Sequence, residues 1–184
     1  MSLRCWHHCF HPETMAPPQS KAIWLNTDGS LTARTVQTPQ SLHNGEALVR
    51  VLFSGVNPAD GKHAGLGIFN TVAGYDFCGI VEEASDGCAY KVGECIAGYT
   101  PTGVDRPQHF GTHQDYIMYP ADDLAFRVPK DMEREHAACL MVTARTAADA
   151  LFNLLGYPLP TEPQKENLPP LLIWGGSSGL GLSV

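Results

Sequence analysis

The stretch from Lys21 to Pro129 is broken repeatedly by glycine and proline, and this pattern limits its fold more than any other feature of the sequence. Short apolar segments lie between the breaks, at residues 21–25, 46–56, 78–84, 91–99 and 113–129. Segment 46–56 alternates apolar and polar residues and then becomes continuously apolar, which predicts a strand buried first on one face and then on both. Many short strands separated by turn residues predict a small antiparallel β-barrel.

A different pattern begins at Asp131. The residues from 132 to 156 are rich in Ala, Leu and Met at helical spacing, and Gly156 is a typical helix stop. We predict one helix or two in this region. A proline-rich loop at 158–170 then leads to the apolar segment 171–174, which we predict to be a strand of the parallel type.

The sequence GGSSGLG follows this predicted strand at once. Glycines in such a place let the backbone bend tightly, and the amides that open the next helix can then face a phosphate. Against the pattern GxGxxG, Gly176 and Gly181 match and Ser178 takes the middle position. Against GxxxGxG, Gly175, Gly179 and Gly181 all match. The turn predicts a dinucleotide site, although a Gly-Ser linker would have a similar sequence.

The N-terminal residues 1–20 differ from the rest of the chain. Side chains that bind soft metals are concentrated there: Cys5, His7, His8, Cys9 and His11. The stretch has no periodicity, and Met15 offers a second start for the chain. We therefore favour a disordered N-terminal extension over a metal site.

Composition narrows the class of protein. A chain of 184 residues can form one domain, or one domain and part of another. Its net charge of -7 argues against nucleic acid or an anionic membrane as the main partner, and no apolar run is long enough to span a bilayer. The six cysteines are irregularly spaced, which predicts reduced thiols in a cytoplasmic protein.

The order of these segments carries a resemblance. KAIWL, GEALVRVLFSGVNPADGK, AGYDFCGIVEEAS, KVGECIAG, GTHQDYIMYPADDLAFRVP, the alanine-rich helix and GGSSGLG follow one another as in medium-chain dehydrogenases/reductases. The resemblance covers residues 21–184. It implies a β-rich GroES-like barrel at 21–140, followed by the start of an α/β Rossmann domain at 141–184. It also implies that most of the Rossmann domain and the last barrel segment are missing from this sequence.

The resemblance bears on zinc as well. Zinc alcohol dehydrogenases have a Cys ligand at the position of Asn57 and a His ligand at the position of Tyr75, and neither replacement is a good zinc ligand. A run of four close cysteines, typical of the structural zinc lobe, is also absent from the sequence. The chain therefore resembles zinc-independent members of the superfamily, and we expect no metal. Cys78, Cys88 and Cys95 are expected to be barrel or surface thiols.

The segment LLGYPLPTEP, the proline-rich loop and the turn with a serine in its middle position are similar to fungal trans-acting enoyl reductases, including the lovastatin type. This resemblance implies NADPH-dependent reduction of an α,β-unsaturated polyketide thioester in secondary metabolism, with a polyketide synthase as partner. It also implies a monomer. Two alternatives remain: a zinc-independent quinone or enone reductase, and a non-catalytic GroES-like fragment.

The resemblance assigns residues to roles. The cofactor is expected to contact Ala59, Asp60, Gly61, Lys62, Val142, Thr143, Ser177, Ser178, Gly179 and Leu180. The acyl substrate is expected to border Thr146, Ala147, Ala148, Asp149, Ala150, Leu151, Phe152 and Asn153, although helix packing explains Ala147, Ala150 and Leu151 better. Lys62 is the candidate catalytic residue, because a cation can polarise an enoyl carbonyl or hold a phosphate. The alternative for Lys62 is an ordinary solvated lysine.

Most adenosine and ribose contacts of a Rossmann domain come from strands that this sequence does not contain. A lone first strand of a parallel sheet also leaves its edges unpaired. We therefore expect the chain as written to bind NADPH weakly or not at all.

Overall fold

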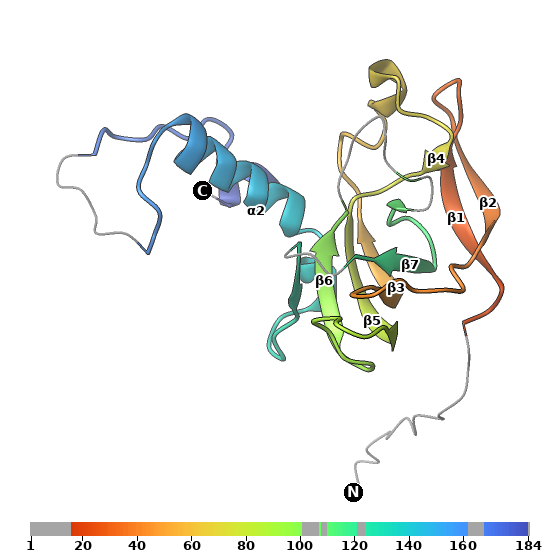
Figure 1. Ribbon diagram of the computed structural model, residues 1–184. Helices are drawn as coiled ribbons and strands as arrows, with labels where there is room; N and C mark the ends of the chain where they lie inside the picture. Colours follow the sequence, from red (N-terminus) through yellow and green to blue (C-terminus); the bar gives the residue numbers. More distant parts are fainter. Residues whose placement is uncertain (1–15, 101–106, 108–109, 121–123, 162–167, 184) are drawn as a thin grey trace, which may run out of the picture.

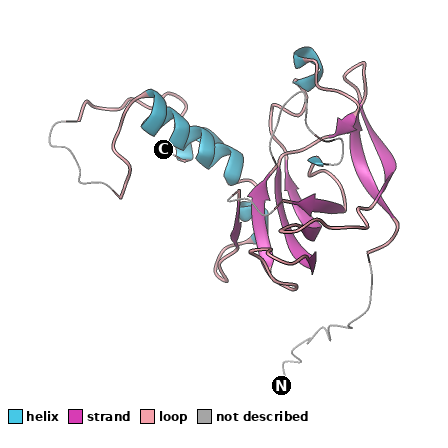
Figure 2. Ribbon diagram, viewed as in Figure 1, coloured by secondary structure: helices cyan, strands magenta, loops and turns pink. Residues whose placement is uncertain are grey.

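The computed structural model describes residues 16–100, 107, 110–120, 124–161 and 168–183. Two antiparallel sheets lie together, and a helical segment projects from one side of them (Figure 1; Figure 2). The predicted β-rich architecture is confirmed. The cysteines and histidines of the N-terminal segment lie outside the described residues.

The smaller sheet has the strand order β2-β1-β4. Its strands are β1 (Gln19–Leu25), β2 (Leu31–Gln37) and β4 (Thr71–Val72). Because β1 begins at Gln19, the prediction of a disordered extension over residues 1–20 is wrong at its C-terminal end. Strand β2 was not predicted, because its side chains are almost all exposed and show no apolar period. Gly29, at a φ of 83°, makes the turn between β1 and β2.

The larger sheet has the strand order β7-β3-β5-β6-β8, and every pair is antiparallel. Its strands are β3 (Ala47–Gly55), β5 (Asp76–Ala84), β6 (Cys95–Tyr99), β7 (Tyr116–Tyr119) and β8 (Ala125–Arg127). These strands confirm the predicted apolar segments. Most of their buried side chains form one cluster, which includes Phe77, Ile96 and Tyr119. Cys78 and Ala97 belong to a second cluster, which packs against the end of the first helix after β8.

The segment that precedes β7 joins the two sheets. The amide of Ile23 donates to the carbonyl of His113 at 2.8 Å, and the amide of Asp115 donates to the carbonyl of Lys21 at 3.0 Å. Because both bonds reach β1, this segment fixes the smaller sheet against the end of the larger one. The two sheets therefore form one barrel-like body, which agrees with the predicted barrel.

Strand β3 is buried in the opposite order to the prediction. Its first residues, Ala47 to Val49, are fully buried, whereas Phe53 is 37% exposed and Val56 is 82% exposed. The reason is the neighbouring strand: β7 pairs with β3 only from Ala47 to Arg50, and the register between β3 and β5 shifts after Val51. The continuous apolar run therefore reaches the surface, where its side chains line a cavity.

Helical structure follows the barrel in separate pieces. A 3-10 turn, η1 (His63–Leu66), comes earlier, in the connection between β3 and β4. The helices α1 (Arg134–Ala137) and α2 (Met141–Ala148) come after the last strand, β8. A π-helical turn at Asp149–Leu154 continues α2, and Gly156 ends it at a φ of 71°. The prediction of one helix or two, with a stop at Gly156, is confirmed.

The predicted strand at 171–174 is wrong. These residues pair with no strand in the part of the chain that the structure describes, and Trp174 is 94% exposed. A parallel strand needs neighbours to satisfy its backbone and cover its side chains, and none lies beside this segment. The chain continues into a short helix, α3 (Gly179–Leu182), which packs against α2.

The described cysteines are free thiols. Cys78 is fully buried, and its Sγ lies 3.7 Å from the Sγ of Cys95 on the adjacent strand. Burial, followed by the neighbouring Cys95, raises the pKa of the Cys78 thiol to about 12. Cys78 is therefore a packing residue of the core, as the sequence predicted for a barrel thiol.

Candidate functional site

A cavity of about 480 Å³ lies where the barrel meets the helical segment. Its wall comes from four parts of the chain: residues 55–58 at the end of β3, Asp76 at the start of β5, Cys139 with one side of α2, and residues 178–180 of the glycine turn. Segments far apart in the sequence thus meet at one place. No lysine or arginine belongs to the described lining of this cavity.

Asp76 holds the barrel side of the cavity to the helix side. Its Oδ1 accepts a hydrogen bond of 2.9 Å from the backbone amide of Val142, and its Oδ2 accepts one of 2.9 Å from the side-chain amide of Asn57. Val142 lies in the first turn of α2, where backbone amides have no partner within the helix. The buried carboxylate of Asp76 therefore caps α2 from another element, with the polarity that a helix N-terminus favours.

A second buried carboxylate stabilises the loop beside this one. Asp60 Oδ2 accepts a hydrogen bond of 2.8 Å from the backbone amide of Asn57 and lies 3.4 Å from Nε2 of His113. Asn57 therefore links Asp60 to Asp76 through its backbone and its side chain.

The pKa values of the two carboxylates are shifted in opposite directions. Burial is the largest influence on Asp76 and raises its pKa above the ordinary value, against the hydrogen bonds from Asn57 and Val142. Burial is also the largest single influence on Asp60. There, however, the hydrogen bonds from His113 and Asn57 together outweigh it and hold the pKa of Asp60 below the ordinary value. The network therefore keeps Asp60 ionised and makes Asp76 easier to protonate.

The glycine turn is built by close backbone contacts. Gly175 has a φ of 83°, and a Cβ on Gly181 would lie 2.5 Å from the carbonyl oxygen of Gly175. Ser178 closes the turn: its amide donates to the carbonyl of Gly175 at 2.9 Å, and its Oγ accepts from the amide of Gly181 at 3.0 Å. Ser178 is thus the N-cap of α3. Its hydroxyl proton can still be donated to another group.

The cavity brings together about half of the residues that were predicted for the cofactor. These are Val142, Thr143, Ser178, Gly179 and Leu180, and Thr146 of the predicted substrate helix joins them. The rest of the predicted set does not line the cavity: Ala59, Asp60, Gly61, Lys62, Ser177, Ala147, Ala148, Asp149, Ala150, Leu151, Phe152 and Asn153.

The residues outside the cavity have other surroundings. Lys62 is exposed at the start of η1, and its amide donates to the carbonyl of Ala59 at 2.9 Å. Ala147 is buried, as expected for helix packing. In the other direction, Gly55, Pro58 and Cys139 line the cavity but were not predicted. A glycine at the end of a strand, just before an Asn-Pro turn, was the one available signal for Gly55.

The two positions that hold zinc ligands in zinc alcohol dehydrogenases have other partners here. The side chain of Asn57 donates to Asp76, and the hydroxyl oxygen of Tyr75 lies 3.0 Å from Nδ1 of His63. Tyr75 is fully buried against His63, and their rings meet edge to face. Among the residues that the structure describes, no three His, Cys, Asp or Glu side chains are grouped as a metal site requires.

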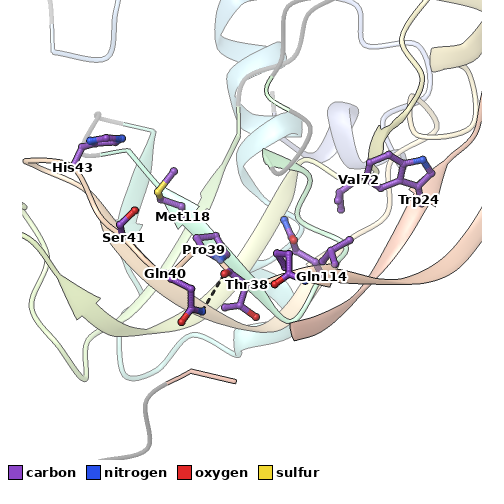
Figure 3. A pocket seen from close by; sticks show the side chains of 11 residues that line it. Trp24, Thr38, Pro39, Gln40, Ser41, His43, Val72, Gln114 and Met118 are labelled. Atoms are coloured by element: carbon purple, nitrogen blue, oxygen red, sulfur yellow. Dashed lines mark hydrogen bonds between the residues drawn. The ribbon is translucent and has the colours of Figure 1, made fainter. Parts of the chain in front are cut away.

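Another cavity, of about 490 Å³, lies against the smaller sheet (Figure 3). Trp24, Val72 and Gln114 form one side of it, and the loop at 37–41 with His43 and Met118 forms the other. None of the residues predicted for cofactor or substrate lines it. It is therefore separate from the cavity at the glycine turn.

Each helix in the described part of the chain is too short or too polar to cross a membrane.

Known proteins are similar to this chain in sequence and in fold. Residues 43–130 match the family of the alcohol dehydrogenase GroES-like domain. A trans-enoyl reductase of Fusarium sp. is 29% identical over 177 residues, which are 92% of this chain and 49% of that protein. A zinc-type alcohol dehydrogenase-like protein of Schizosaccharomyces pombe is 32% identical over 151 residues, which are 76% of this chain and 41% of that protein. The chain thus spans about half the length of the curated relatives it matches.

Solved structures agree on the fold. An alcohol dehydrogenase superfamily protein from Novosphingobium aromaticivorans superposes with a TM-score of 0.73 at 23% identity, over 89% of this chain and 48% of that one. The crotonyl-CoA carboxylase/reductase AntE, in complex with NADP, gives a TM-score of 0.68 at 22% identity, over 95% of this chain and 51% of that one. Residues 43–130 therefore belong to the alcohol dehydrogenase GroES-like domain family, and the chain as a whole is similar to alcohol dehydrogenase superfamily proteins and to trans-enoyl reductases.

Proposed function

We propose that this chain serves NADPH-dependent reduction of an α,β-unsaturated polyketide thioester, as part of a trans-acting enoyl reductase. The observation that carries the proposal is the cavity at the glycine turn, whose wall includes Gly179 and Leu180 of the turn together with Val142 and Thr143 of α2. Relatives named trans-enoyl reductases, similar along 92% and 85% of this chain, support the enoyl substrate class.

The residues of the cavity fit one end of a nicotinamide cofactor. Val56, Val142 and Leu180 offer apolar surface for a flat ring. The hydroxyls of Thr143 and Thr146 donate to the helix carbonyls of Leu140 at 2.9 Å and Val142 at 2.6 Å. Their oxygens are therefore left as acceptors, which suits the amide group of nicotinamide.

The other end of the cofactor has less support. Gly179 lies so close to α2 that a Cβ would be 3.1 Å from Cγ2 of Thr143, so the backbone of the turn can approach a phosphate only on its remaining side. The described lining contains no lysine or arginine that could hold a 2′-phosphate. When bound, NADPH would supply the hydride. The residues of this chain would orient its ring and exclude water from it.

We expect this chain alone to bind NADPH more weakly than the low micromolar range. The reason is that the described residues supply a ring-binding wall and a glycine turn but no basic side chain in the same cavity. Isothermal calorimetry on the 184-residue protein measures this directly. Tight binding would contradict the expectation and would show that the described wall and turn suffice.

The proposed reaction is tested by turnover in the longest natural protein that contains this sequence. We expect NADPH oxidation with an α,β-unsaturated acyl-pantetheine thioester and little with a simple quinone. Faster quinone turnover would instead favour a quinone or enone reductase. Bound NADPH without turnover of either substrate would favour a non-catalytic GroES-like protein.

The same assay tests the predicted role of Lys62. If Lys62 polarises the enoyl carbonyl, Lys62→Ser lowers turnover by about 100-fold, the size typical of losing one electrostatic donor. The structure places Lys62 on the surface outside the cavity, so this role requires the side chain to reach in when substrate is bound. Lys130→Ser, at another exposed lysine, is the matched control. Equal turnover of both variants and the parent would remove Lys62 from the mechanism.

A further inference from the structure

A serine, a histidine and an aspartate lie beside the smaller sheet, and the histidine ring contacts the serine with one nitrogen and the aspartate with the other. The Oγ of Ser54 lies 2.5 Å from Nδ1 of His113, and Nε2 of the same ring lies 3.4 Å from Oδ2 of Asp60. Ser54 is the residue before the last one of β3, His113 lies in the segment that joins the two sheets, and Asp60 lies in the loop after β3. Only the tertiary fold brings the three together.

The contacts fit a neutral His113 that carries its proton on Nε2. With its proton on Nε2, His113 faces the carboxylate of Asp60 as a donor and accepts the Ser54 hydroxyl proton on Nδ1. The hydroxyl of Thr112, 3.0 Å from Ser54 Oγ, can then donate to that oxygen. The backbone carbonyl of Asp76, at 3.1 Å, is the competing acceptor for the Ser54 proton. The short distance to His113 favours the ring nitrogen.

The environment is arranged as a nucleophile requires. Asp60 is 2% exposed, and its lowered pKa keeps the carboxylate charged behind the ring, after the opposing effect of burial. The side chain of His113 is 12% exposed. Gly74, at a φ of 93°, leaves room for the ring, because a Cβ there would lie 2.6 Å from Nδ1 of His113. The carboxylate of Asp60 is therefore buried, and the backbone at Gly74 packs closely against the ring of His113.

Ser54 and His113 also face a cavity of about 510 Å³, and Asp60 does not. This cavity shares only Val56 with the one at the glycine turn. Apolar side chains form much of its wall, among them Ile23, Val51 and Phe53. Lys21 is the one described lining residue with a fixed positive charge.

We propose that Ser54, His113 and Asp60 form a nucleophilic serine site that accepts esters of short apolar acids. The apolar wall suits the acyl group, and the Lys21 ammonium is the cation that can stabilise the negative oxygen. The arrangement has the serine, base and orienting acid of hydrolytic triads, on an unrelated fold. It does not depend on NADPH or on the glycine turn.

The chemistry balances without a further reactant. Ser54 Oγ bonds to the ester carbonyl carbon as its proton passes to Nδ1 of His113. The bond from that carbon to the alcohol oxygen then breaks, and His113 returns the proton to the departing alcohol. Water repeats the two steps on the acyl-serine, which releases the acid and restores Ser54.

The test uses a fluorophosphonate probe and p-nitrophenyl butyrate on the 184-residue protein. We expect the probe to attach to Ser54, identified by peptide mass spectrometry, and the ester to be hydrolysed in a burst. Ser54→Ala should abolish both signals. His113→Gln should slow labelling by at least about 100-fold, because it removes the base. Ser30→Ala, at an exposed serine of the β1–β2 turn, is the control that should change neither.

Thermal unfolding of each variant shows whether a lost signal reflects lost folding. Asp60→Asn, which keeps the size of the side chain, provides a further variant if His113→Gln does not fold. A folded parent protein that the probe does not label at Ser54 would overturn the proposal. So would labelling at Ser54 that persists unchanged in folded His113→Gln, since Ser54 would then react without a base.

Discussion

Gly55→Ala is expected to lower the free energy of unfolding by about 3 kcal/mol, because the added methyl group has no room. A Cβ at Gly55 would lie 2.3 Å from the carbonyl oxygen of Ala138 and 3.0 Å from Cβ of Asp76. The first of these atoms is backbone at the end of α1, so a rotamer change cannot relieve the clash. Gly55 does not have a positive φ, so the cost is one of packing. Thermal and urea unfolding measure it.

Gly61→Ala is the matched control for this prediction. Gly61 is exposed in the loop after β3, and nothing lies within 4 Å of a Cβ built there. Its substitution should change stability by less than about 0.5 kcal/mol. Equal effects of the two substitutions would show that α1 can move away from β3 at no cost. In that case the close approach would not set the position of the cavity.

Asp76→Ala is expected to cost about 2 kcal/mol, because it leaves two partly buried donors without an acceptor. These donors are the amide of Val142 at the start of α2 and the side-chain amide of Asn57. Asp76→Asn keeps an acceptor of nearly the same shape and should cost less. Circular dichroism and urea unfolding compare the variants. A loss of similar size in both would contradict the argument from unpaired donors.

The pH dependence of stability gives a second measurement on the same residue. The folded protein holds the Asp76 proton more tightly than the unfolded chain does, since burial raises its pKa. Stability from this group is therefore greatest in acid and falls as pH rises from the ordinary carboxyl range through the raised pKa. Asp60, with a lowered pKa, has the opposite effect and loses stability as pH falls. Asp76→Asn should remove the first slope and leave the second.

Most strands could be predicted because turn residues mark their ends. Gly and Pro occur in the turns that end β5, β6 and β7, and the apolar residues between these turns are buried when the strands pair into a sheet. The exposed strand β2 was missed, because its side chains carry no apolar pattern and its pairing with β1 is through the backbone. The prediction of a strand at 171–174 was wrong for a related reason. Its apolar sequence resembles a strand, but a strand forms only where a neighbour accepts its hydrogen bonds.

For the candidate site, too, some features could be predicted from the sequence and others needed the structure. The glycine turn, Val142 and Thr143 could be identified along the chain, and they do meet in one cavity. The position of Lys62 could not be predicted, because the loop after β3 reaches the cavity only as far as Pro58, and the exposed Lys62 lies outside the lining. The partners of Asn57 also needed the structure, since its bond to Asp76 spans 19 positions of the sequence.

By itself, the sequence determined the antiparallel strands, the helix after them and the resemblance to medium-chain dehydrogenases/reductases, because periodicity, turn residues and motif order can be read along the chain. The tertiary structure alone decided which groups share a site. Asp76 caps a helix that begins 65 residues later, and Ser54 in the larger sheet contacts His113 in the segment that joins the two sheets. Such contacts depend on how the sheets pack against each other and against the helices. Close backbone contacts, such as that between Gly55 and Ala138, set these positions. No local pattern records that packing.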